Sequence, residues 1–185
     1  MSYQRYSGTA ADILDAAERR MRRGGYEAVS FRDIAGDAGI KSASVHYHFP
    51  QKADLAVALI ERYGSRFLTG LRSADSSGES SSARIERLCR AYETAFVDDG
   101  LPCLCCVLGA ESRDLPDPVA DAIRSFFEQL LAWTENALSP APRKDRLGAA
   151  QIVAGLQGAM ILAIATGRPE IVAQTSNRIL AQLRS

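Results

Sequence analysis

The residues of this chain whose side chains are best suited to chemistry lie between Ser30 and Lys52, in the segment SFRDIAGDAGIKSASVHYHFPQK. Their hydroxyls and imidazoles can form hydrogen bonds with base edges, their small side chains allow close approach to thymine methyl groups, and their cations suit phosphates. This chemistry favours binding in the major groove of DNA. The residues expected to make these contacts are Ser30, Arg32, Lys41, Ser42, Ala43, Ser44, His46, Tyr47, His48 and Lys52.

Two short helices joined by a glycine turn are predicted to position these side chains. Ser30 can cap the first helix, and Gly39 suits the left-handed conformation that ends a helix or makes a tight turn. The second helix is expected from Ser42 to His48, where Val45 and Phe49 are four residues apart and can anchor it. The pattern predicts a helix-turn-helix. Its alternative is an amphipathic helical hairpin whose polar residues only face water.

The segment from Ile13 to Leu55 resembles the DNA-binding region of the TetR family of bacterial repressors. The resemblance rests on GY, DIA, AG and HYHF in this order, with a lysine three residues after Phe49. The chain departs from the family pattern at Lys41, His46 and Ala53, where serine, tyrosine and glutamate are common. The resemblance implies a transcription regulator of the repressor type that binds double-stranded palindromic operator DNA as a homodimer.

Hydrophobic periodicity indicates helices along the rest of the chain, without a convincing strand pattern. We therefore expect an all-α protein of about nine helices. An N-terminal three-helix helix-turn-helix domain at residues 1–50 would precede an effector-binding and dimerisation domain at residues 51–185, in which residues 51–72 form a connecting helix. The polar segment from Ser73 to Ser82 is predicted to break the helical pattern after that connecting helix.

The segment RLGAAQIVAGLQGAMILAIAT, within a helix expected from about Lys144 to Thr166, is apolar on almost every side. Such a helix needs neighbours on more than one side, and a second subunit can supply them. The TetR resemblance points to the same interface, because members of the family dimerise through their last two long helices. The alternative is a central core helix of a monomer. The residues expected at the interface are Gly155, Gly158, Ala159, Leu162 and Ile179.

Three of the four cysteines lie within GLPCLCCVLGAE, Gly100 to Glu111. Pro102 suits the first turn of a helix, where unpaired backbone N–H groups would favour a thiolate at Cys103, and Cys106 one turn later could act as a resolving thiol. These two cysteines are the candidate reactive thiols. The segment resembles a TetR subgroup that includes an N-ethylmaleimide-responsive repressor, which implies an electrophile or oxidant sensor triggered at Cys103. The alternatives are small apolar packing residues and a metal site; the latter lacks a nearby histidine, and no metal ligand is assigned.

The TetR resemblance also implies an effector pocket among the middle helices. Aromatic and thiol side chains there suggest a small apolar, aromatic or electrophilic effector. Each candidate also lies at a helical period that a plain hydrophobic core requires. The candidates are Tyr92, Phe96, Cys103, Phe126, Phe127 and Trp133.

Charge and hydropathy limit the classes of function that the chain can have. The formal net charge is zero from 22 basic and 22 acidic residues, yet residues 1–74 hold 11 basic against 8 acidic residues, which agrees with DNA binding at that end. The N-terminus lacks the apolar region of a signal peptide, and the apolar run from Ile152 to Thr166 is too short to span a bilayer. We expect a cytoplasmic protein that does not span a membrane and whose cysteines are free thiols. No catalytic residue, metal or cofactor is assigned.

The predicted mechanism is release from the operator when the C-terminal domain binds or reacts with a small molecule. Two other function classes compete with it. A cysteine-dependent oxidoreductase would need a base near its thiol and a CxxC motif on a β-α-β unit, and neither is found. A ligand-independent structural DNA binder would leave the large C-terminal part of the chain without a role.

Overall fold

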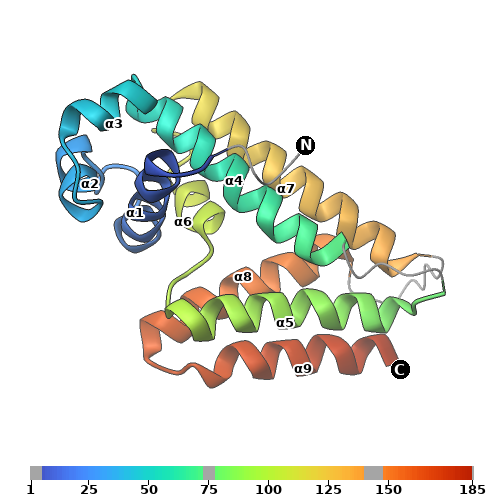
Figure 1. Cartoon of the computed structure of the whole chain (residues 1–185). Helices are drawn as coiled ribbons and strands as arrows, with labels where there is room; N and C mark the ends of the chain where they lie inside the picture. Colours follow the sequence, from blue (N-terminus) through green and yellow to red (C-terminus); the bar gives the residue numbers. More distant parts are fainter. Residues whose placement is uncertain (1–5, 73–77, 140–147, 185) are drawn as a thin grey trace. The chain divides into compact units, whose positions relative to one another are not determined.

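The computed structural model describes residues 6–72, 78–139 and 148–184, and these residues form nine helices and no strand. The expected all-α fold is confirmed, and the helices predicted at Ser42–His48 and Lys52–Arg72 have those bounds (Figure 1). The helices are α1 Thr9–Gly24, α2 Phe31–Asp37, α3 Ser42–His48, α4 Lys52–Arg72, α5 Ser81–Asp99, α6 Leu104–Ala110, α7 Asp117–Leu138, α8 Ala149–Thr166 and α9 Glu170–Arg184.

The chain divides into two compact units. Unit 1 comprises Met1–Arg66 and Leu104–Phe126, and unit 2 comprises Phe67–Cys103 and Phe127–Ser185. The long helices α4 and α7 are each divided between the units, after Arg66 in α4 and after Phe126 in α7. This division differs from the boundary expected after residue 50, because α6 and the first parts of α4 and α7 belong to the same unit as the N-terminal helices. The functional domains 1–50 and 51–185 therefore stay a prediction.

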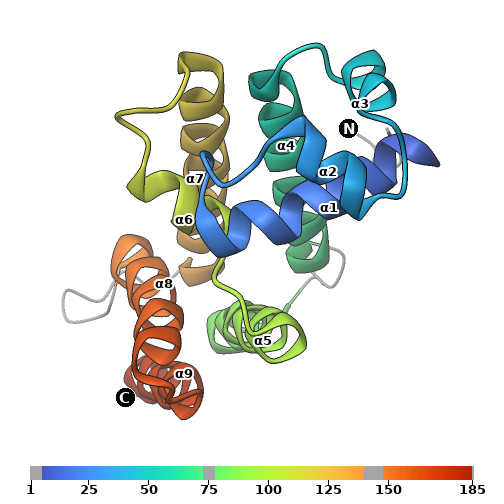
Figure 2. The same ribbon diagram turned by 90° about the vertical axis from the view of Figure 1, so that its left-hand side faces the viewer.

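Unit 1 is built on α1, which contacts α2, α3 and α6 (Figure 2). Ile13, Leu14 and Met21 recur at the helical period and are fully buried, so that one face of α1 enters the core. The helix ends before Gly25, whose φ of +77° is costly for any residue with a Cβ atom. The sequence thus sets both the buried face of α1 and the point where the chain turns away.

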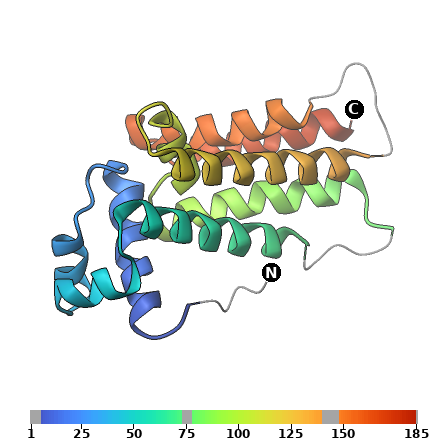
Figure 3. The same cartoon turned by 90° about the horizontal axis from the view of Figure 1, so that it is seen from above.

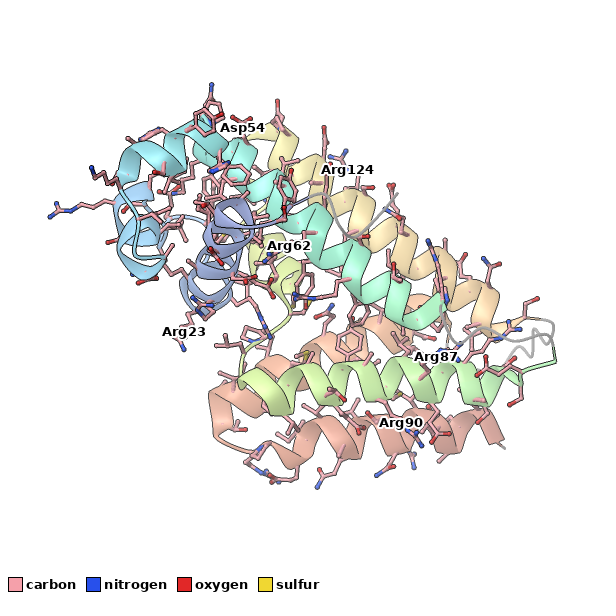
Figure 4. The ribbon with its side chains drawn as sticks, viewed as in Figure 1. Arg23, Asp54, Arg62, Arg87, Arg90 and Arg124 are labelled. Carbon is pink, nitrogen blue, oxygen red and sulfur yellow. The ribbon has the colours of Figure 1, made fainter. Side chains whose placement is uncertain are left out.

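A buried carboxylate joins α1 to α4 in unit 1. Glu18 Oε2 lies 3.1 Å from Arg62 Nη2, and Glu18 Oε1 lies 2.6 Å from Arg66 Nη2. The guanidinium of Arg22, itself buried, is 3.8 Å from the same carboxylate. Figure 4 shows Arg62 between the two helices. Charges removed from water need partners of opposite sign, and here one carboxylate serves three arginines.

Unit 2 centres on α5, which packs against α8 and α9. Ile85, Leu88 and Tyr92 lie on one face of α5 and are buried. The helices α5 and α9 run in opposite directions (Figure 1), with α8 beside α9 (Figure 3). Ser80 caps α5 by accepting a hydrogen bond from Ala83 N at 3.2 Å. Of the polar segment expected to break the chain, residues 73–77 lie outside the described residues, as do residues 140–147 before α8.

The helix α8 is apolar on several sides, as expected, but only part of it is covered. Leu156 and Met160 are buried within unit 2, whereas Ile161, Leu162 and Ile164 are exposed. By length and composition α8 is the one described helix that could cross a membrane, and 44% of it is buried inside the protein. A core helix that also meets a partner has the same properties.

We expect that Glu18→Gln lowers the free energy of unfolding by about 3 kcal/mol, because it removes the buried carboxylate that Arg22, Arg62 and Arg66 share. Urea denaturation at neutral pH measures this change. Glu86→Gln is the matched control, since the Glu86–Arg90 pair lies on the exposed side of one helix. It should cost less than about 0.5 kcal/mol. Equal effects of the two substitutions would contradict a structural role for the Glu18 network.

Candidate functional site

The α2–turn–α3 segment forms as the sequence predicts. Ser30 Oγ accepts a hydrogen bond from Asp33 N at 3.2 Å and so caps α2. Gly39 has a φ of +66°, the left-handed conformation expected of the turn. Ile34 on α2 and Val45 on α3 are fully buried, so that apolar contacts hold the two helices together. The result is a compact helix-turn-helix.

One face of α3 is held by unit 1 and the other faces solvent. Val45 is buried, and so is Phe49 directly after the helix. The Tyr47 side chain is 84% exposed, the highest value among the exposed large hydrophobic residues described. A tyrosine ring at this exposure is available to a binding partner. Of the residues predicted on this face, Ser44 is half-buried and the exposed ones are Lys41, Ser42, Ala43, His46, Tyr47 and His48.

The two histidines of α3 are oriented by aromatic neighbours. The His46 ring meets the Phe31 ring of α2 edge-on, with 4.6 Å between centroids. The His48 ring meets Tyr47 edge-on at 5.2 Å. His46 therefore helps to fix α3 on α2, while Tyr47 and His48 form an aromatic pair at the exposed end of the helix.

Some charged and polar groups around the helix pair already have partners within the protein. Arg20 Nη2 donates to Asp37 Oδ1 at 2.9 Å, which ties α1 to the end of α2. This hydrogen bond lowers the pKa of the Asp37 carboxyl and raises that of Arg20. The Ser30 hydroxyl, predicted to contact DNA, donates to Asp33 Oδ2 at 2.6 Å. Arg32 is exposed on α2.

Lys52, predicted to contact a phosphate, lies at the first position of α4. Its Nζ is 3.4 Å from Glu27 Oε2 and 4.2 Å from the centre of the Tyr26 ring. Burial raises the pKa of the Tyr26 phenol, and the charge of Glu27 adds to the shift. The α4 start is capped by Asp54, labelled in Figure 4, whose Oδ2 accepts from Gln51 N at 3.0 Å. Lys52 thus connects α4 to the loop before α2.

Glu111, directly after α6, forms a hydrogen bond with the loop before α2, a role that was not predicted from the sequence. Its Oε2 accepts a hydrogen bond from Tyr26 N at 2.9 Å. A Cβ atom on Gly25 would lie 1.8 Å from Glu111 Oε1, so that only glycine leaves room for the carboxylate. The glycine pair at the end of α1 and the glutamate after α6 were both visible in the sequence. Their contact was not, because 85 residues separate Tyr26 from Glu111.

The six predicted effector-pocket residues do not all belong to one unit. Phe126 lies in unit 1, where its ring is 6.2 Å from that of Tyr63 and covers Gly64, whose added Cβ would lie 2.9 Å from the Phe126 ring. It therefore packs against core residues there, and its role in an effector pocket stays a prediction. The other five belong to unit 2, and all are buried except Phe127, which is half-buried: Tyr92, Phe96, Cys103, Phe127 and Trp133.

A buried polar contact lies beside the aromatic residues of unit 2. Gln157 on α8 donates from Nε2 to the hydroxyl of Tyr92 on α5 at 2.8 Å, and both residues are buried. The Phe67 ring meets Tyr92 edge-on at 5.5 Å. The sequence prediction named Tyr92 but not Gln157. A glutamine within an otherwise apolar stretch of α8 was the available signal.

The cysteine-rich segment differs from its prediction at the helix start. We expected Pro102 in the first turn, but α6 begins at Leu104, so that Pro102 and Cys103 precede the helix. Cys103 is only 4% exposed and Cys105 is buried, whereas Cys106 is half-buried. Proline is compatible with a helix start, yet the packing of α6 against α1 decides where the helix begins.

Cys89 behaves as the core residue that its place on α5 indicates. Burial raises the pKa of its thiol to about 11, an effect that a hydrogen bond with Ser176 partly offsets. All four cysteines lie in the described ranges and are thiols rather than disulfides. Within those ranges no three histidine, cysteine, aspartate or glutamate side chains gather in a way that could hold a metal ion.

The five predicted dimer residues have different surroundings. Ala159 and Ile179 are buried within unit 2, so their side chains are already covered by their own chain. A Cβ on Gly155 would lie 3.9 Å from Thr175 Cγ2, which places this glycine against α9. A Cβ on Gly158 would meet nothing within 4 Å, and Leu162 is 55% exposed. The apolar surface that stays open on α8 is therefore Ile161, Leu162 and Ile164.

Comparison with known proteins places this fold and its helix-turn-helix in a family. Residues 13–59 match the model of bacterial regulatory proteins of the tetR family. The chain is 32% identical over 82 residues to the HTH-type transcriptional repressor KstR2 of Rhodococcus jostii (strain RHA1), a match that covers 44% of this chain and 40% of that relative. The chain thus spans less than half of the length of this relative.

Solved structures extend the likeness beyond the helix-turn-helix. A TetR-family transcriptional regulator from Agrobacterium tumefaciens has a TM-score of 0.85 and 28% identity, with 94% of this chain and 96% of that chain covered. The reduced form of NemR from E. coli has a TM-score of 0.70 and 20% identity, covering 92% and 94%, and at this identity the likeness concerns the fold. The helix-turn-helix match and the likeness over nearly the whole length show that residues 13–59 are a DNA-binding region of the tetR family and that the chain has the fold of a TetR-family transcriptional regulator.

Proposed function

We propose that the chain is a DNA-binding transcriptional repressor that reads a palindromic operator through α3. The observation that carries this proposal is the exposed face of α3, where Tyr47 and His48 face solvent while Val45 and Phe49 fix the opposite side. A short helix held in this way can enter the major groove without changing its own packing. The proposed contact residues stay those of the sequence prediction. The hydroxyl of Ser30 caps α2, so its proposed effect on DNA binding is to order the backbone at the start of that helix.

A homodimer would complete this function. The open apolar surface of Ile161, Leu162 and Ile164 on α8 supports a second copy as the partner, because two identical surfaces can cover each other about a twofold axis. The twofold axis would present two copies of α3 to the two halves of the operator. Gly158 lies in the same helix and would allow close approach of the partner, since it has open space where a side chain would be.

The proposed trigger is a small apolar or aromatic effector taken up among the buried aromatic side chains of unit 2. Binding would favour one of two states that differ in their affinity for the operator. Within unit 1, α6 is positioned to act on the helix-turn-helix, because Glu111 holds the backbone of Tyr26 just before α2. A shift of α6 would therefore move the loop from which α2 begins.

We assign the protein to the cytoplasm and to regulation rather than catalysis, with no cofactor and no membrane. Support comes from the relative described as a transcriptional repressor and from the helix-turn-helix match. The partial burial of α8 within unit 2 favours a core and interface helix over a membrane span.

A thiol-based sensor is the second candidate, with Cys103 as the trigger. The observation that favours it is the half-buried thiol of Cys106 on α6, the helix that leads to Glu111. The burial of Cys103 weighs against direct attack by a reagent, because a covered thiol has to be exposed before it reacts. The non-covalent effector therefore remains the preferred proposal.

Replacement of Tyr47 by alanine should weaken binding to the DNA upstream of the protein's own gene by about tenfold or more, since one side chain at a base edge contributes about 1–3 kcal/mol. Fluorescence anisotropy with labelled DNA measures the affinity. The free energy of unfolding should stay within about 0.5 kcal/mol of wild type, because the ring is exposed. Arg124→Ala, which removes an exposed cation from α7, should leave the affinity unchanged. If the two variants bind alike, α3 is not the reading element.

Treatment with N-ethylmaleimide at neutral pH should modify Cys106 well before Cys89, whose raised pKa leaves only about one thiol in ten thousand ionised. Mass spectrometry of digested protein gives the order. With a non-covalent effector, the modified protein keeps its affinity for the DNA upstream of its gene. The thiol sensor would instead be established if the reagent releases wild type and Cys106→Ser from the DNA but does not release Cys103→Ser.

A further inference from the structure

Gln157 and Ser176 are the uncharged buried residues of unit 2, within the described ranges, that have a side-chain polar atom without a hydrogen-bond partner, and the amide of Gln157 is the one beside the aromatic residues. The residue is 7% exposed, and its Nε2 donates to the Tyr92 hydroxyl at 2.8 Å. Its Oε1 is buried and has no hydrogen-bond partner among the residues that the structure describes. Burying an acceptor without a partner costs about 1–3 kcal/mol. A methionine of similar length would fill the same position without that cost, so the amide oxygen calls for an explanation.

Aliphatic and aromatic side chains lie next to Gln157. Leu156 and Met160 flank Gln157 on α8 and are buried, and the Tyr92 ring on the other side is covered by Phe67. In the described part of unit 2 the buried polar residues are Thr134, Gln157 and Ser176, and none of them carries a charge. The Thr134 hydroxyl is already used, because it donates to Leu130 O at 2.8 Å.

We propose that Gln157 Oε1 is the polar anchor of the effector site, and that the effector is a neutral, largely apolar molecule with one hydrogen-bond donor, a hydroxyl or an N–H group. This inference rests on the proposed function and gives the chemical class of the effector. The donor satisfies the acceptor that the folded chain leaves without a partner. The rest of the molecule lies against the aromatic and aliphatic side chains around Tyr92.

Neutrality follows because no fully buried residue in the described part of unit 2 is charged, and the guanidinium of Arg87, 6.0 Å from the centre of the Trp133 ring, is already paired with Glu79 at 2.8 Å. An ionised ligand in this interior would lose its hydration without a compensating ion pair, which costs far more than a hydrogen bond returns. The donor requirement follows from the amide itself, since its N–H side already meets Tyr92. Because Oε1 is enclosed, the ligand has to displace neighbouring side chains, and its binding is thereby coupled to a change in the packing of α5 and α8.

A matched pair of probes tests the proposal. Isothermal titration of the full chain compares 4-tert-butylphenol with 4-tert-butylanisole, which keeps an acceptor oxygen but has no donor. Wild type should bind the phenol about tenfold more tightly. In Gln157→Met this preference should fall to about twofold or less, because the acceptor is gone. The same variant loses the hydrogen bond to the Tyr92 hydroxyl together with the unpaired oxygen, so its thermal midpoint without ligand is measured to check that it is folded.

Gln174→Met, an exposed glutamine of α9, is the control and should keep both the preference and the thermal midpoint of wild type. Gln157→Leu is the second variant if the methionine variant does not fold. Equal binding of the two probes to wild type, no binding of either at millimolar concentration, or a preference that survives in Gln157→Met would each overturn the proposal. Binding of each protein to the DNA upstream of its gene is measured in parallel. If wild type does not bind that DNA, the repressor function is rejected, and the result on ligand selectivity is unaffected.

Discussion

The carboxylate of Glu18 is the interaction on which the rest of unit 1 depends. Buried in α1, it receives Arg62 and Arg66 from α4 and lies beside the buried guanidinium of Arg22. A charge in this position is stable only while its partners stay in place, so α1 has one favourable orientation on α4. The helices α2 and α3 pack on α1 in turn. The orientation of the exposed face of α3 is therefore set by an ion-pair network whose central carboxylate is buried.

The loop between α1 and α2 contacts residues at the ends of two other helices that help to position α3. Glu111 holds the Tyr26 N–H from the side of α6, in a space that exists because Gly25 has no side chain. Lys52 lies over the Tyr26 ring at the start of α4. Two helices thus meet the chain at the point where it turns into α2. A regulator needs such a point, because a small displacement there is passed on to α2 and α3, whose mutual packing is rigid.

Local sequence signals predicted most of the fold, and long-range contacts account for what they missed. The bounds of α3 and α4, the Ser30 cap and the Gly39 turn each depend on residues within a few positions of one another. The start of α6 was predicted wrongly at Pro102, because packing on α1 decides it. Glu111 and Gln157 form their contacts across 85 and 65 residues of sequence, and no periodicity indicates such partners.

The affinity of Glu111→Ala for the DNA upstream of the gene tests most directly whether the junction held by Glu111 controls the reading helix. Substitution leaves the Tyr26 N–H without its charged acceptor while the surface of α3 is unchanged. Under conditions where the variant is fully folded, the account predicts a dissociation constant about tenfold higher than that of wild type. Glu128→Ala, on an exposed position of α7, should bind as wild type does. Wild-type affinity in the folded Glu111→Ala variant would contradict the account, because the position of the helix pair would then be independent of α6.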